Sequence, residues 1–109
     1  MTARGRSRLR AWWGYRGRWR QRMRACHLTT GEGGVTAYPV ALEVRLGDIT
    51  DRVVVRMLPG QCPADWENRV DVLADVFGAR DCRAWLVGPS RMELVFWHRI
   101  PGDGMEAAA

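Results

Sequence analysis

The sequence predicts a small α+β domain, an antiparallel or mixed sheet of ββαββ order with one covering helix, preceded by a basic N-terminal helix. Two pairs of short apolar runs, each pair broken by a turn, flank one segment with helical spacing. The chain of 109 residues is long enough for one modest core and not for two. We therefore expect a basic arm over residues 1–31, the ββαββ domain over 35–99 and a frayed tail over 100–109.

The N-terminal segment, residues 6–28, has the pattern of a basic amphipathic helix. At about 100° per residue its apolar side chains fall within a stripe of about 140°; they are Leu9, Trp12, Trp13, Trp19, Met23 and Cys26. Gly14 and Gly17 each cost about 1 kcal/mol relative to Ala inside a helix, so we expect partner binding to help order it. Residues 29–34, TTGEGG, are predicted to be a flexible linker.

The first predicted hairpin joins residues 35–46 to residues 52–58. The earlier run, VTAYPVALEVRL, is dense in β-branched and apolar residues, and Pro39 confines its first half to an edge or an approach segment. Gly47 and Asp48 begin the turn. The later run, RVVVRML, has the clearest strand composition in the chain.

One helix is predicted over residues 63–77. Pro63 suits the first turn, and Asp65 and Glu67 favour the positive end of the helix dipole. Gly78 supplies the left-handed residue that ends many helices. Its core-facing side chains recur at helical spacing, and they are Trp66, Val70, Leu73, Ala74 and Phe77.

The second predicted hairpin joins residues 82–87, CRAWLV, to residues 92–99, MELVFWHR. Gly88-Pro89-Ser90 between two apolar, aromatic-rich runs is a turn signal. This hairpin completes the predicted sheet on the far side of the helix.

Charge divides the chain into two parts. Residues 1–31 hold nine Arg and no acid, a formal charge of +9, whereas residues 32–109 hold eight Arg and twelve acids, a charge of −4. Arginine interleaved with aromatic rings suits phosphates and bases, or an anionic membrane surface. The alternative is that the tryptophans only pack against the body. The candidate binding residues are Arg8, Arg10, Trp12, Trp13, Arg16, Arg18, Trp19, Arg20, Arg22 and Arg24.

Catalytic, cofactor and metal sites are not predicted. The chain contains no Lys, which excludes a Walker A loop and a Schiff-base lysine. Cys26, Cys62 and Cys82 are too scattered for a zinc site. Asp48 with Asp51 is interpreted as turn chemistry, and His98 as an ordinary strand histidine. With no spanning segment and no secretory signal pattern, we expect a cytoplasmic protein, with the inner face of the membrane as the alternative location.

Residues 51–99 resemble a segment of actinobacterial FtsK/SpoIIIE-type DNA translocases, which are encoded on conjugative plasmids and integrated elements. The resemblance lies in Asp51-Arg52-Val53, the run RMLPGQ over residues 56–61, Pro63, FGAR over 77–80, Cys82-Arg83 and FWHR over 96–99. The Arg/Trp segment near residues 15–28 is similar to the basic stretch that follows the membrane helices of this family.

The resemblance implies a piece that lies between a membrane region and an ATPase motor. It implies a non-catalytic linker or adaptor of a DNA transfer protein, truncated or split, with the motor as a possible partner subunit. Two alternatives remain open at this point. The chain is an independent nucleic-acid-binding module that uses the Arg/Trp arm, or it is a peripheral membrane-binding domain that uses the same arm.

Overall fold

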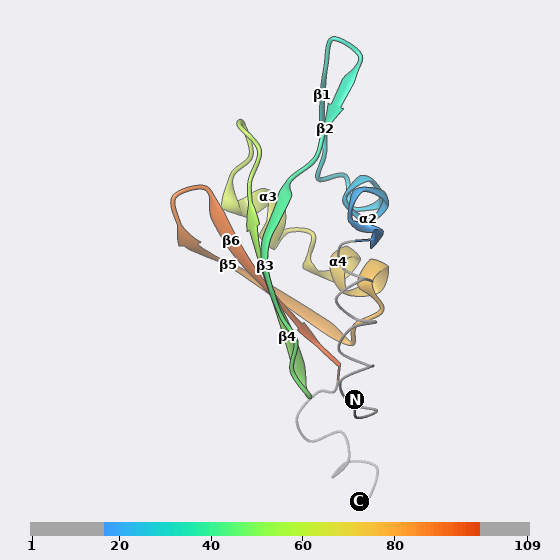
Figure 1. The fold of residues 1–109 in the computed structure, drawn as a ribbon, viewed down its shortest axis with the longest axis vertical. Helices are drawn as coiled ribbons and strands as arrows, with labels where there is room; N and C mark the ends of the chain where they lie inside the picture. The colour runs from blue at the N-terminus through green and yellow to red at the C-terminus, as the bar shows by residue number, and fades with distance from the viewer. Residues whose placement is uncertain (1–16, 99–109) are drawn as a thin grey trace, which may run out of the picture.

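A computed structural model describes residues 17–98, and it contains three helices and six strands in that range (Figure 1). In chain order they are α2 (Trp19–Ala25), β1 (Thr30–Glu32), β2 (Val35–Ala37), β3 (Val40–Arg45), β4 (Thr50–Arg56), α3 (Pro63–Glu67), α4 (Val70–Phe77), β5 (Asp81–Gly88) and β6 (Arg91–Trp97). The part of the predicted basic helix before residue 17 and the predicted tail lie outside the described residues.

The predicted α+β class with an antiparallel sheet is confirmed. The main sheet has four strands in the order β3-β4-β6-β5, and every neighbouring pair is antiparallel. The central pair aligns Val53 with Leu94 and Arg56 with Arg91. Because β4 and β6 occupy the centre, β3 and β5 are the two edge strands.

The element order differs from the predicted one at residues 30–37. These residues form a separate β1–β2 hairpin in which Glu32 pairs with Val35. The prediction had a flexible linker over residues 29–34 and placed residues 35–37 in the first strand of the main sheet. Gly33 and Gly34 both have positive φ, at 60° and 82°. Two consecutive positive φ angles are what a two-residue hairpin turn requires, so these glycines are turn residues.

The predicted helix over residues 63–77 is two helices. Pro63 begins α3 and Gly78 ends α4 with a left-handed φ of 70°, as predicted. Between the helices, Arg69 leaves helical geometry with φ −119° and ψ 14°. The break changes the direction of the chain, and Trp66 of α3 and Leu73 of α4 are both completely buried.

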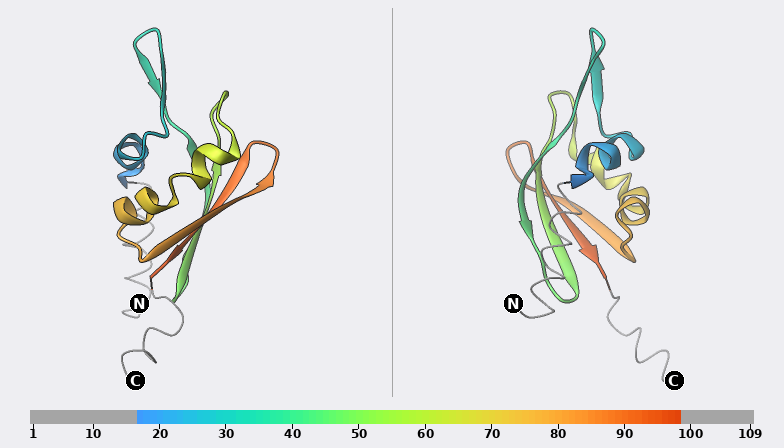
Figure 2. Two further views of the ribbon diagram at one scale, coloured as in Figure 1. Left: turned by 180° about the vertical axis from the view of Figure 1, so that it is seen from behind. Right: turned by 45° about the vertical axis from the view of Figure 1, so that its right-hand side comes forward.

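The three helices cover one face of the main sheet and leave the other face open (Figure 2). Alternate residues of β4 and β6 point to the covered face, and Val53, Val55, Met92, Leu94 and Phe96 have no exposed surface. The helix α2 joins this core through side chains that are also buried, namely Trp19, Met23 and Cys26. Within residues 17–98, no helix has both the length and the apolar character needed to cross a bilayer.

Candidate nucleic-acid interface

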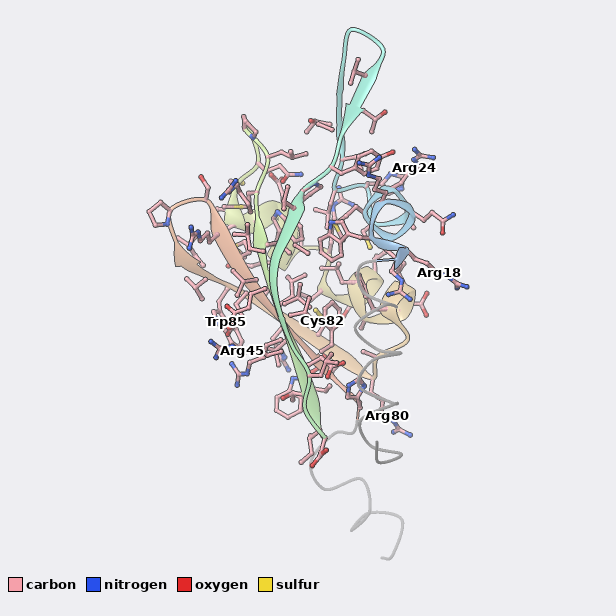
Figure 3. All side chains as sticks on the ribbon, viewed as in Figure 1. Arg18, Arg24, Arg45, Arg80, Cys82 and Trp85 are labelled. Carbon is pink, nitrogen blue, oxygen red and sulfur yellow. The ribbon has the colours of Figure 1, made fainter. Side chains whose placement is uncertain are left out.

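The helix α2 holds one apolar face against the domain and turns its arginines outward. Trp19, Met23 and Cys26 recur at spacings of four and three, which places them on one side of a helix. Arg18, at the N-cap, and Arg20 and Arg24 within the helix are exposed. Figure 3 shows Arg18 and Arg24 on the outer side of α2. The basic surface is therefore carried by a helix that the core fixes in place.

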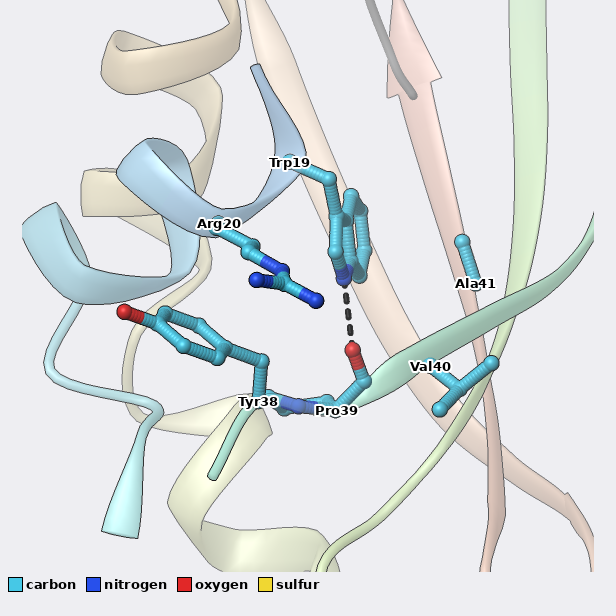
Figure 4. Close-up of a pocket in the computed structure, with 6 residues that line it drawn as sticks. All are labelled: Trp19, Arg20, Tyr38, Pro39, Val40 and Ala41. Atoms are coloured by element: carbon cyan, nitrogen blue, oxygen red, sulfur yellow. Dashed lines mark hydrogen bonds between the residues drawn. The ribbon is translucent and has the colours of Figure 1, made fainter. Parts of the chain in front are cut away.

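The anchor of α2 is Trp19. Its indole N–H donates to the Pro39 carbonyl oxygen at 2.6 Å (Figure 4), and its ring centroid lies 5.8 Å from that of Phe77. The guanidinium of Arg22 lies 4.7 Å from the same Phe77 ring centroid. Trp19 is only 7% exposed, so its ring serves packing and offers little surface to a base.

Tyr38 lies between two arginines of α2. The guanidinium carbons of Arg20 and Arg24 are 5.3 Å and 5.8 Å from the Tyr38 ring centroid, within the range of cation–π attraction. Arg24 also donates a hydrogen bond to the Tyr38 hydroxyl oxygen. Next to this group is an open cavity of about 230 Å³ (Figure 4), lined by Trp19, Arg20, Tyr38, Pro39, Val40 and Ala41.

Three arginines at α2 have exposed side chains, and they are Arg18, Arg20 and Arg24. In the part of the chain that the structure describes, neither Arg18, Arg20 nor Arg24 forms an ion pair with an acid. Two acids of the sheet, Glu43 and Asp51, pair with Arg45 and His98. The guanidinium groups are thus available to an external anion, and phosphates are the anions that such groups hold in nucleic acids.

The predicted binding residues divide into three groups. Arg8, Arg10, Trp12, Trp13 and Arg16 lie outside the described residues. Arg18, Arg20 and Arg24 form the exposed surface of α2, whereas Arg22 is partly covered and Trp19 is buried. Sequence reasoning missed Tyr38, because no local spacing connects it to a helix that ends 13 residues earlier, at Ala25.

Asp51 and His98 form a contact that the sequence analysis did not predict. The Asp51 carboxylate is 1% exposed and lies 2.6 Å from His98 Nε2. It also accepts a hydrogen bond from the Gly47 backbone N–H at 3.1 Å. The carboxylate therefore ties the turn before β4 to the end of β6.

Two of the three cysteines are buried thiols. Burial raises the pKa of Cys82 to about 12 and that of Cys26 to about 11. A thiol with so high a pKa is a poor nucleophile at neutral pH. No three His, Cys, Asp or Glu side chains of residues 17–98 gather as metal ligands.

Comparisons with protein-family models, with curated proteins and with solved structures found no match for this chain. The resemblance to FtsK/SpoIIIE-type translocases stays a prediction that depends on the residues quoted above.

Proposed function

We propose that this chain is a non-catalytic module that binds nucleic acid through the exposed arginines of α2, assisted by Tyr38. The observation that carries the proposal is a set of three exposed arginines, Arg18 at the N-cap of α2 and Arg20 and Arg24 within it, on a helix fixed by the core. Among the side chains that the structure describes, none of the three forms an ion pair with an acid. A fixed helix holds the backbone of these arginines in one arrangement before binding. Less conformational entropy is then lost when the partner binds.

The same geometry favours nucleic acid over a lipid surface for the described part of the arm. A helix that lies in a membrane interface inserts its apolar face among the headgroups. In α2 that face is already covered, because Trp19 is 7% exposed and Met23 and Cys26 are fully buried. What α2 and the adjacent Tyr38 present to an outside partner is charge and one partly exposed aromatic ring.

The resemblance to DNA translocases gives the proposal a setting. In that family, a module that binds the DNA backbone beside the motor would keep the substrate near the point of entry. We propose such a linker or adaptor role, with an ATPase motor as the partner subunit. Genes next to this one that encode a motor would support this setting.

The test is a titration of labelled duplex DNA with the full chain at several salt concentrations. Each arginine that contacts a phosphate contributes about 0.9 to the slope of log K against log salt. We expect the R18Q/R20Q/R24Q variant to lose most of its affinity and to reduce the slope by about two to three. The matched control is R45Q/R52Q/R83Q, which removes the same charge from arginines that already pair with acids.

We expect the control to bind the duplex nearly as the parent chain does. An unchanged salt slope in R18Q/R20Q/R24Q would show that α2 does not contact phosphates. A second arm uses vesicles with and without anionic lipid. Binding to anionic vesicles that is tighter than binding to DNA, with a blue-shifted tryptophan emission, would favour the membrane alternative.

A further inference from the structure

The open face of the main sheet brings two arginines directly opposite each other. Arg56 of β4 and Arg91 of β6 are register partners, and both side chains are exposed. Directly opposed residues on one face have Cβ atoms about 5 Å apart, and like charges there destabilise a sheet. An anion that bridges the two guanidinium groups would remove this repulsion.

The other arginines of the open face are already neutralised. Arg45 pairs with Glu43 at 2.6 Å, Arg52 with Glu93 at 3.1 Å and Arg83 with Asp81 at 3.2 Å. Among residues 17–98, by contrast, no acid pairs with Arg56 or Arg91. The positive charge of this face is therefore concentrated at one end of the central strand pair.

An exposed aromatic ring lies on the same face as the arginine pair, on the strand next to that of Arg91. Trp85 of β5 is the register partner of Glu93, which is two residues from Arg91 along β6 and on the same face. The Trp85 indole N–H donates to Glu93 Oε1 at 3.2 Å, and Trp85 remains 41% exposed. Figure 3 shows Trp85 on the side of the sheet away from α2. The hydrogen bond holds the ring in place on the open face.

The strand next to Arg91 leaves space for its side chain. Gly88 of β5 is the register partner of Arg91, and a Cβ added there would lie 3.9 Å from Arg91 Cδ. The stem of Arg91 therefore passes over the glycine toward β5. This brings the guanidinium-bearing side chain to the same strand as Trp85.

From this arrangement we infer that the open face binds single-stranded nucleic acid, with a backbone phosphate on Arg56 and Arg91 and a base stacked on Trp85. Guanidinium groups are well suited to phosphate oxygens. A base can stack on an aromatic ring only when it is free of a duplex, which selects a single strand. The inference uses none of the α2 residues of the proposed function, so each can fail without the other.

An acidic peptide would also meet the arginine pair, and the tryptophan separates the two kinds of partner. A carboxylate gains from the guanidinium groups but gains no base stacking from Trp85. Strong dependence of binding on an aromatic side chain at position 85 is therefore the signature of a nucleic-acid base.

The test measures binding of a short labelled oligothymidine to the full chain and to variants of the open face. Stacking of one base corresponds to a loss of about fivefold to a hundredfold when the ring is removed, and we expect W85L to show such a loss. W85F keeps a ring and should retain most of the affinity. The R56Q/R91Q double variant should reduce the salt slope by about 0.7, the value for one phosphate contact on a single strand, and each single variant should reduce it by less.

Two designs make the result specific to this site. The R56Q/R91Q double variant should lose less than the product of the two single losses, because both groups hold one phosphate. The matched control is R80Q, which removes an exposed arginine at the other end of β5, where the Arg80 backbone N–H bonds the Trp97 carbonyl. We expect R80Q to change affinity by less than about twofold.

Outcomes against the inference are equally definite. Oligothymidine binding that W85L leaves unchanged would exclude stacking on this ring. Equal losses of oligothymidine affinity in R80Q and R91Q would show that only the net charge of the chain matters. Polyglutamate that displaces the oligonucleotide, and whose own affinity falls as much in W85L, would indicate a peptide site instead. Circular dichroism spectra of each variant serve as the control for folding. When W85L is added to the R18Q/R20Q/R24Q variant, it should still lower the affinity for oligothymidine, even if that variant no longer binds duplex DNA.

Discussion

The two faces of the main sheet are made from alternate residues of the same strands, and they differ in burial and charge, although Val95 on the open face is 1% exposed. On β4, Val53 and Val55 are fully buried under the helices, while Arg52 and Arg56, on either side of this pair, are exposed. On β6, Phe96 is buried and Glu93 is partly exposed. Substitutions one residue apart can therefore alter the buried core or the charge of the open face separately.

The two basic surfaces differ in a similar way. On α2 the exposed arginines Arg18, Arg20 and Arg24 have no acidic partners among the described residues. On the open face, ion pairs hold Arg45, Arg52 and Arg83 and leave only Arg56 and Arg91 unpaired within the same range. The number of arginines thus says less about binding than the position of the acids does.

The largest expected effect is on the covered face. The Phe96 side chain is fully buried, and its ring centroid lies 4.6 Å from that of Phe77. Phe96→Ala should lower the free energy of unfolding by about 3–5 kcal/mol, from lost burial and the cavity that remains. Val54→Ala, on the open face, should cost less than about 1 kcal/mol. Urea titrations measure both, and similar losses would contradict the division between faces.

A pair of Trp→Phe substitutions compares the same chemical change on the two faces. Trp19→Phe removes a buried donor and leaves the Pro39 carbonyl without it, at an expected cost of about 1–3 kcal/mol. Trp85→Phe removes a hydrogen bond at an exposed position and should cost about 0.5 kcal/mol or less. Thermal unfolding checks the pair, and the reverse order would show that α2 is not anchored by Trp19.

Alanine substitutions at two glycines compare a position where a neighbouring backbone atom lies close with one where it does not. A Cβ on Gly47 would lie 2.5 Å from the Thr50 carbonyl oxygen, whereas one on Gly88 would meet nothing closer than Arg91 Cδ at 3.9 Å. Gly47→Ala should destabilise the chain by about 1–3 kcal/mol because the turn must shift. Gly88→Ala should be neutral within about 0.5 kcal/mol. Equal stabilities of the two variants in urea would show that the turn adapts without cost.

The buried thiols predict an alkaline loss of stability. Burial raises the pKa of Cys82 from 9.0 to about 12, with a smaller contribution from Asp81. Above pH 9 the unfolded chain loses this proton while the folded chain keeps it, so stability falls as pH rises from 9 toward 12. Cys82→Ala should reduce the fall between pH 8 and 10 by about 1 kcal/mol. An unchanged pH profile in that variant would assign the alkaline loss to other groups.

Local patterns predicted the parts of the fold that depend on few residues. The strand runs, Pro63 at the start of a helix and Gly78 at its end all follow from chemistry within one or two turns of chain. Gly33 and Gly34 show that composition alone does not distinguish a flexible linker from a hairpin turn. Adjacent glycines are compatible with a flexible linker and with a two-residue hairpin turn, and only the pairing of β1 with β2 decides between them.

The candidate sites depend on distant residues, which the sequence does not bring together by spacing. The arginine-rich character of α2 was visible, but the burial of Trp19 requires Pro39 and Phe77. The Arg56–Arg91 pair joins residues from two hairpins through the β4–β6 register. Because one slip of register would place them on opposite faces, the pairing could not be read from either strand alone.

The smallest effect should come from the ion pair at the centre of the open face. Arg52 Nη1 lies 3.1 Å from Glu93 Oε1, and the two side chains are 48% and 19% exposed. A double-mutant cycle of Arg52→Ala and Glu93→Ala, measured by urea unfolding, should give a coupling of about 0.2–1 kcal/mol, since water screens such pairs. Glu93→Ala also frees the Trp85 indole N–H, so it should loosen the ring without unfolding the sheet. A coupling well above 1 kcal/mol would mean that the open face contributes to stability as the covered face does, and the proposed separation of stability from recognition would then be wrong.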